Sequence, residues 1–210
     1  MKRECGSCTL CCKLLPVASE SRKLHIETLE AAIRHGLLTR EEAANTVPDF
    51  HKPAGQRCPH QRASKGCTIY ATRPFGCRFW NCRWLVNDDT GDLSRPDRSH
   101  YVIDVSPDYV TADDGAGRHQ VVPVVQIWVD PNYPDAHRDP ALRRYLERRG
   151  REGWAALIRL DRREAIFVAP PSLSADGKWY EMRTQLESEI EHTVEDKVRA
   201  LGPMKVVMAQ

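Results

Sequence analysis

Residues 5–12 have the sequence Cys-Gly-Ser-Cys-Thr-Leu-Cys-Cys, and this short segment constrains the fold more than any other part of the chain. Three of its cysteines recur at intervals of three residues, and a fourth follows the third directly. A loop of this length can fold back and direct several sulfur atoms at one point. Tetrahedral zinc sites and iron–sulfur clusters need that arrangement of thiolates. The segment therefore predicts metal binding and leaves the identity of the metal open.

All the cysteines of the chain lie in its first 82 residues: Cys5, Cys8, Cys11, Cys12, Cys58, Cys67, Cys77 and Cys82. The N-terminal residues are basic, but no apolar stretch follows them, so we expect no secretory signal peptide and a cytoplasmic location. Structural disulfides are rare in that reducing compartment. The alternatives are four disulfides in a secreted protein, or thiols buried as small apolar side chains. The clustering and the missing export signal favour metal ligation over both.

The bulk composition describes an ordinary globular chain. Its 31 basic and 29 acidic side chains give a net charge of +2, so no overall field attracts nucleic acid or anionic lipid. The chain has no run of about 18 apolar residues, and we therefore predict no membrane span.

A helical pair is predicted between the two groups of cysteines. From Glu27, apolar residues recur at helical spacing, and Gly36 is expected to end that helix in a left-handed conformation. Thr39 and Glu42 match a capping box, which would open a second helix that Pro48 stops. We interpret this pair as the spacer that folds the second cysteine group back onto the first.

The second cysteine group, from residue 58 to residue 82, is expected to be mostly loop with a short helix, because glycine and proline punctuate it. Arg73 precedes a proline and should be extended. Arg73 and Arg78, and less directly Arg83, could offset the charge of bound thiolates from outside the ligand shell; solvated surface charge is the alternative. His51 and His60 are near enough in sequence to replace a cysteine, although loop histidines are more often surface residues.

The spacing also resembles a known family. The pattern Cys-x2-Cys-x2-Cys-Cys, then Cys-Pro, then Cys-x-Ile-Tyr-x2-Arg-Pro-x2-Cys-Arg, is similar to the CxxCxxCC family of zinc- or iron-chelating proteins over about residues 5–85. The resemblance implies a metal or iron–sulfur domain whose function is mostly unassigned. Flagellin lysine methylases resemble the same domain, so an enzymatic use stays open. Cys82 lies just beyond the family core.

The partition of the thiols among metals stays open at the level of sequence. Adjacent residues usually point their side chains apart, so Cys11 and Cys12 would be strained as ligands of one metal. Either one ligates and the other packs, or each serves a different metal. Eight thiols allow two four-thiolate sites, or one cluster with spare cysteines. Structural zinc more often uses two separated Cys-x2-Cys pairs, and a second pair is missing from the sequence, which favours iron over zinc.

The second half of the chain is predicted to complete an α+β fold with a small antiparallel or mixed sheet and helices. The polar stretch 87–92 suggests a division into residues 1–92 and 93–210. The expected elements are strands at 101–105 and at 121–129, the latter starting after Pro123; a glycine-containing loop at 113–118; a helix from Asp139 to Gly150; a hairpin of strands 155–160 and 165–168; and a long amphipathic helix over 179–200.

The composition leaves several functions to compare. The first is a metal-binding protein whose second half contacts a protein partner. The second is a methylase-like enzyme that uses the metal centre, with no catalytic residue identifiable. A nucleic-acid module, suggested by the rings and arginines of residues 78–84, is not favoured because the net charge is near neutral. A thiol–disulfide redox protein would need its Cys-x-x-Cys beside a βαβ unit, which is not expected here.

Overall fold

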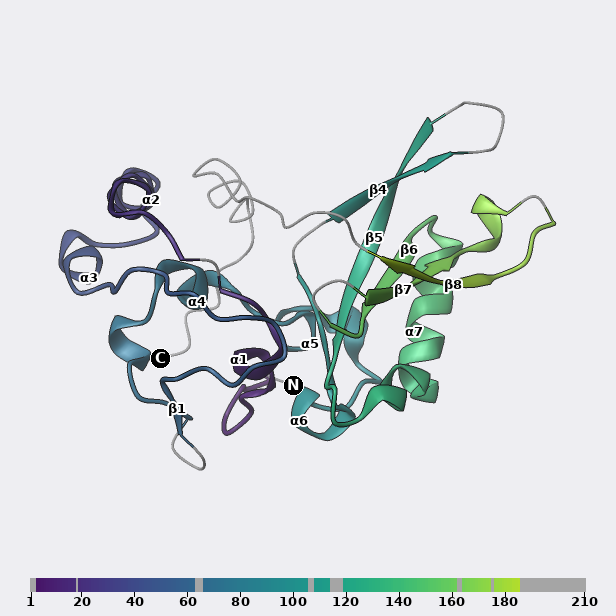
Figure 1. Ribbon diagram of the computed structural model, residues 1–210, viewed down its shortest axis with the longest axis horizontal. Coiled ribbons are helices and arrows are strands. Elements are labelled where there is room, and N and C mark those ends of the chain that lie inside the picture. Colours follow the sequence, from purple (N-terminus) through teal and green to yellow (C-terminus); the bar gives the residue numbers. More distant parts are fainter. Residues whose placement is uncertain are drawn as a thin grey trace.

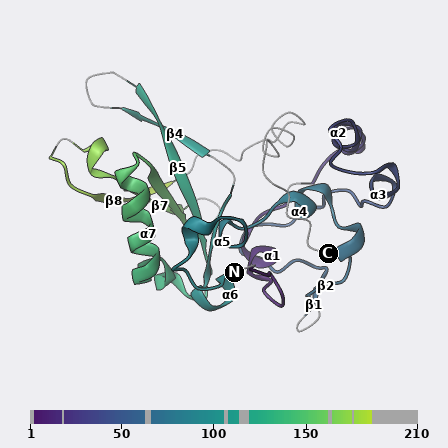
Figure 2. The same ribbon diagram turned by 180° about the vertical axis from the view of Figure 1, so that it is seen from behind.

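The computed structural model describes residues 3–17, 19–62, 66–105, 108–113, 119–161, 164–174 and 176–185. The fold is α+β: a cysteine-rich half of short helices and loops lies beside a six-stranded mixed sheet (Figure 1 and, from behind, Figure 2). No helix among these residues is long and apolar enough to cross a membrane.

The predicted helical pair is present between the two cysteine groups. α2 (Arg22–Arg34) begins five residues earlier than predicted, because the Ser21 side chain accepts a hydrogen bond from the Leu24 amide and caps it. Its end is confirmed at Gly36, which has a φ of 68°. The Leu37 amide reaches back to the carbonyl of Ala32, as in a Schellman motif.

The capping box of α3 (Arg40–Ala44) is also confirmed. The Glu42 amide donates to the Thr39 hydroxyl at 3.1 Å, and the Thr39 amide donates to the Glu42 carboxylate at 2.8 Å. The helix ends at Ala44, before the predicted stop at Pro48.

Thr39→Ala should lower the free energy of unfolding by about 1 kcal/mol, because it removes the acceptor of one helix-terminal amide. Urea denaturation followed by circular dichroism measures this loss. The exposed Thr68 hydroxyl donates to the His60 carbonyl and accepts no helix-terminal amide from the described residues, so Thr68→Ala is the matched control and should change stability less. Equal losses in the two variants would contradict the capping role.

Short elements make up the rest of the cysteine-rich half, as predicted. They are α1 (Leu10–Leu14), β1 (Gln61–Arg62), β2 (Gly66–Cys67), η1 (Tyr70–Thr72), α4 (Phe75–Phe79), α5 (Arg83–Val86), η2 (Asp88–Thr90) and α6 (Pro96–Ser99). Phe75 and Phe79 of α4 pack in one buried cluster with Ala32 and Leu38 from the helical pair. The spacer therefore supports the second cysteine group directly.

The sheet has the order β3-β5-β6-β7-β8, and β4 pairs with β5 beyond the end of β3. Its strands are β3 (Tyr101–Ile103), β4 (Asp108–Asp113), β5 (His119–Val129), β6 (Ala155–Arg159), β7 (Glu164–Ala169) and β8 (Tyr180–Gln185). β5 and β6 are parallel and are joined through η3 (Pro134–Arg138) and α7 (Pro140–Arg151), whereas all other pairs are antiparallel. A short turn, η4 (Pro171–Leu173), follows β7. The predicted hairpin of β6 and β7 and the Asp139 cap of α7 are confirmed.

The prediction that the second strand starts after Pro123 is wrong. β5 passes through Pro123, which pairs with Tyr109 of β4. Pairing with β6 begins only at Val124, so on that side the proline lies beyond the neighbouring strand, a position that tolerates a missing amide. Strand β4 was not predicted, and most of the expected loop at 113–118 lies outside the described residues.

The prediction of a long helix starting at residue 179 is also wrong in its first part. Residues 180–185 form β8, paired with β7 from Tyr180↔Ala169 to Gln185↔Glu164. Apolar residues four apart also share one face of a strand, so the spacing did not distinguish the two structures. Residues 186–200 of that predicted helix lie outside the described residues.

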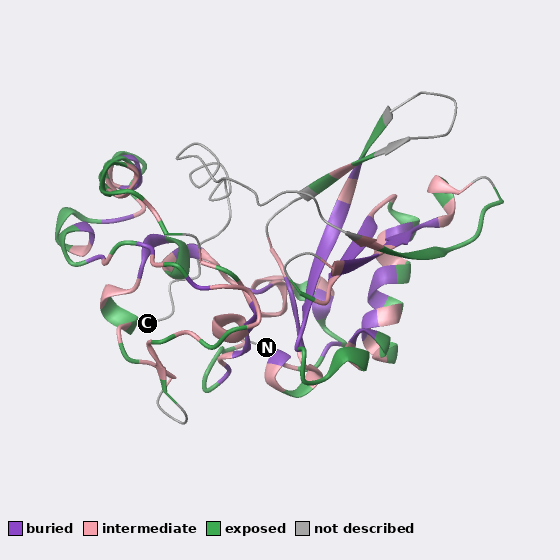
Figure 3. Ribbon diagram, in the orientation of Figure 1, coloured by how far each residue is buried: buried purple, intermediate pink, exposed green. Residues whose placement is uncertain are grey.

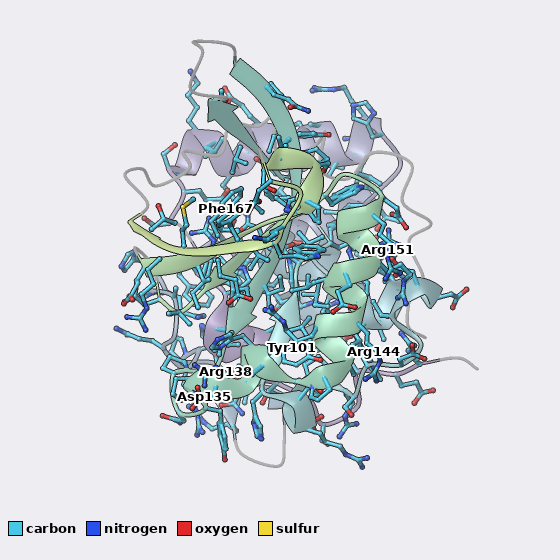
Figure 4. The ribbon with its side chains drawn as sticks, turned by 90° about the vertical axis from the view of Figure 1, so that its right-hand side faces the viewer. Tyr101, Asp135, Arg138, Arg144, Arg151 and Phe167 are labelled. Carbon is cyan, nitrogen blue, oxygen red and sulfur yellow. The ribbon has the colours of Figure 1, made fainter. Side chains whose placement is uncertain are left out.

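The central strands are covered on both faces. On one face Tyr101, Ile127 and Ile158 pack in a core with Leu142 and Tyr145 of α7. Figure 3 shows this buried layer between helix and sheet, and Figure 4 shows Arg144 and Arg151 of α7 pointing away from it.

On the opposite face, Val102 of β3 and Trp128 of β5 pack against the cysteine-rich half. The predicted link at residues 87–92 instead packs toward α7, since Thr90 is fully buried and the Asp89 carboxylate lies 3.5 Å from the Arg149 guanidinium of α7. The division of the chain at residues 92 and 93 stays a prediction.

Candidate metal centre

The first cysteine loop is a tight turn that leads into α1. Gly6 has a φ of 53°, and the Cys8 amide donates to the Cys5 carbonyl at 2.9 Å, so the chain reverses between the first two cysteines. Cys5 is exposed and Cys8 is buried. Cys11 and Cys12 follow within α1, where both are half-buried.

The second cysteine group lies against this helix. The Cys58 amide donates to the Cys12 carbonyl at 3.1 Å, and the Gln61 amide donates to the Cys58 carbonyl at 3.0 Å. Gln61 in turn pairs with Cys67 across the two-stranded β1–β2 ladder. Cys77 lies on α4 with an exposed side chain. The predicted folding back of the second group onto the first is thus present in the backbone at Cys12 and Cys58.

Cys82 occupies a different position from the rest of its group. It immediately precedes α5 and is 8% exposed. It belongs to one packed cluster with Cys8, Leu14 and the two sheet residues Val102 and Trp128, and Cys11 packs against the same cluster.

Two pairs of thiols interact directly, and the interaction lowers the pKa of one partner in each. A hydrogen bond from Cys5 lowers the pKa of Cys8 to about 6, although burial opposes the change. A hydrogen bond from Cys11 lowers the pKa of Cys12 to about 7, and the charge of Lys52 adds to that effect. Burial raises the pKa of Cys82 to about 11. In each pair the same interaction raises the pKa of the other thiol, Cys5 or Cys11.

Lys52, which the sequence did not single out, lies beside these thiols. Lys52 is 3% exposed. Its ammonium donates to the carbonyls of Lys13, Pro53 and Gln56 at 2.9–3.2 Å. Burial lowers its pKa, whereas the charges of Cys58 and Cys12 raise it. A buried cation of this kind is matched by thiolate charge. An isolated lysine in a loop carries no pattern that would have revealed it.

Arg95 is a second cation that the sequence analysis missed. A Cβ built on Gly6 would lie 3.3 Å from an Arg95 guanidinium nitrogen, so this side chain lies against the first cysteine loop. Asp97 holds the guanidinium through two hydrogen bonds of 2.6 and 2.7 Å.

The predicted arginines differ in position. Arg73 is extended as predicted, and its guanidinium donates to the Cys77 carbonyl at 3.0 Å while it lies over the Tyr70 ring. Arg78 donates to the Arg73 carbonyl at 3.2 Å and so supports the same turn. Their roles at a metal stay predictions. Of the two candidate histidines, His51 is exposed and His60 packs its ring edge-on against Phe50.

The donor chemistry fits a thiolate-bound metal. All eight cysteines are described and all carry free thiols, so the disulfide alternative does not apply to this structure. No three cysteine, histidine, aspartate or glutamate side chains of the described residues already form a metal-holding group. Ligation would therefore require the thiols to rotate toward the metal.

All eight cysteines are free thiols in the N-terminal half of the chain, and the buried Lys52 ammonium lies in the same half. The comparison with protein families agrees: residues 4–94 match the CxxCxxCC family, described as a "putative zinc- or iron-chelating domain". The match covers less than half of the chain, and over residues 4–94 it confirms the resemblance noted in the sequence. Neither a curated protein nor a solved structure matches the chain.

Proposed function

We propose that the protein binds an iron–sulfur cluster or zinc through thiolates drawn from both cysteine groups. The observation that carries the proposal is the junction at Cys12, where the Cys58 amide binds the Cys12 carbonyl and the buried Lys52 ammonium lies alongside. This junction brings ligands from distant parts of the chain to one place. A four-thiolate site carries net negative charge, which a buried ammonium offsets.

Iron is favoured over zinc within this proposal. The Cys-x2-Cys-x2-Cys run of residues 5–11 is shared with ferredoxin-like ligand runs. Of the two histidine candidates near the motif, His51 is exposed and His60 is already packed against the Phe50 ring. A thiolate-only donor set suits a cluster as well as a single soft metal ion.

The aromatic residues that suggested nucleic-acid binding are used inside the fold. Phe79 is 9% exposed, the Trp80 indole donates to the Asp104 carboxylate at 2.9 Å, and the Trp84 indole donates to the Leu93 carbonyl at 3.0 Å. Rings held in this way are not presented to bases, so this alternative is not proposed. The expected protein partner of the C-terminal half and the cytoplasmic location stay predictions.

Anaerobic purification of the full chain, followed by metal analysis and a visible spectrum, tests the proposal. We expect a brown protein with iron and sulfide in proportion; a colourless protein with stoichiometric zinc would support the zinc form instead. A well-folded protein that binds neither metal, and whose stability does not change when the cysteines are replaced by serine, would refute the proposal.

A further inference from the structure

We infer that the outer edge of β8 is a self-association surface, on which a second copy of this chain adds its own β8 in antiparallel orientation. β8 is the last strand of the sheet and pairs, within the described part of the chain, with β7 alone (Figure 1). Such an edge strand leaves a row of backbone amides and carbonyls that another strand can pair with. The inference concerns the C-terminal half and does not depend on the proposed metal centre.

Two large side chains of β8 are exposed at this edge. Tyr180 is 46% exposed and Met182 is 55% exposed. They lie on one face of the strand, since side chains alternate between the two faces along it. Among the described strands Met182 has one cross-strand neighbour, Phe167 of β7, whereas a residue of an interior strand has one on each side. A further strand beside β8 would cover both side chains.

Symmetry restricts how two β8 strands can meet in one sheet. A closed dimer needs a two-fold axis, and an axis normal to the sheet makes the two strands antiparallel. That axis also keeps the face that carries α7 on the same side in both subunits. Directly opposed residues then belong to the same face, so the axis passes beside one residue of β8 and not between two.

The charges of β8 select one of these registers. Glu181 and Arg183 both lie on the α7 face, where Glu181 forms an ion pair with Arg143 of α7 and Arg183 forms one with Glu164 of β7 at 2.8 Å. An axis beside Glu181 would oppose two carboxylates, and an axis beside Arg183 would oppose two guanidinium groups; like charges directly opposed destabilise a strand pair. An axis beside Met182 instead opposes Glu181 to Arg183 of the partner subunit, twice in the dimer.

The register centred on Met182 also pairs the residues of the other face. It places Met182 against Met182 of the partner subunit and Tyr180 against the partner's Thr184, so each strand covers exposed apolar surface of the other. The side chains of Glu181 and Arg183 are 42% and 74% exposed, so their internal ion pairs leave room for a second partner. A single strand pair is a small interface, and we therefore expect a dimer that dissociates on dilution.

Two charge-reversal variants of the full chain test this register by sedimentation velocity over a concentration series. Glu181→Arg and Arg183→Glu each oppose like charges across the axis when alone, whereas an equimolar mixture of the two opposes unlike charges at both positions. We expect the wild type to dimerise and each variant alone to do so roughly tenfold more weakly, because two cross-strand pairs change from attractive to repulsive. The mixture should dimerise about as strongly as the wild type.

The mixture is its own control for folding, since each variant loses the same internal ion pair whether alone or mixed. Circular dichroism checks that both variants are folded. Arg138→Glu is the matched surface control, because the Arg138 side chain is 75% exposed on η3, and it should leave dimerisation unchanged. A wild type that stays monomeric at about 1 mM, or a mixture no more dimeric than the separate variants, would overturn the inference. Dimerisation that neither reversal weakens would place the interface elsewhere and overturn it too.

Discussion

Lys52→Met is expected to weaken metal binding beside Cys12 by roughly tenfold or more and to lower the free energy of unfolding by about 3–5 kcal/mol. The ammonium is buried and serves three backbone carbonyls while its charge lies beside Cys12 and Cys58. Methionine keeps much of the volume and removes the charge and all three donors. Chelator competition measures the metal affinity, and urea denaturation of the metal-free protein measures stability.

The control for this prediction is Lys178→Met. Lys178 forms an ion pair with Asp176 at 3.3 Å, but its side chain is 76% exposed, so the variant should change neither quantity by much. A Lys52→Met protein that is destabilised but keeps wild-type metal affinity would show that Lys52 serves only the backbone carbonyls. Unchanged stability in the metal-free state would contradict the structural part of the prediction.

The predictions from sequence were most accurate for helix ends and turns, which depend on residues close together in the chain. The left-handed cap at Gly36, the capping box of Thr39 and Glu42, and the Asp139 cap of α7 all depend on residues within one or two helical turns, and all are confirmed. The hairpin of β6 and β7 was also predicted, because its strands are close in sequence. Local chemistry is sufficient for such elements.

Distant contacts explain what the sequence missed. β4 is held by pairing with β5, and β8 by pairing with β7. The ring of Trp179, just before β8, packs closely on Gly150 of α7, because a Cβ added to Gly150 would lie 2.0 Å from that ring. At the candidate site the cysteines were all proposed from their spacing, and their role as ligands stays a prediction. Lys52 and Arg95 were missed, because only the tertiary fold brings them to the thiols.

The contact between the cysteine-rich half and the sheet leads to a second prediction of a large loss of stability. Cys8 and Cys82 share a buried cluster with Trp128 of β5, so the packing of these two thiols depends on the sheet. Trp128→Ala should lower the free energy of unfolding by about 3–5 kcal/mol through the cavity it leaves. The variant should also release metal roughly tenfold more readily, because Cys8 and Cys82 lose the surface that orients them.

Trp154→Ala separates these two effects. Trp154 packs against the core on the α7 side of the sheet, away from the thiol cluster, so its loss should reduce stability without changing metal affinity. Unfolding is followed by circular dichroism, and metal release by transfer to a coloured chelator under conditions where both variants are folded. Equal metal release from the two variants would show that general destabilisation, and not the packing of Cys8 and Cys82 on Trp128, controls the site. Faster release from Trp128→Ala alone would instead mean that the sheet and the metal centre are energetically coupled, which gives the C-terminal half a direct role in holding the metal.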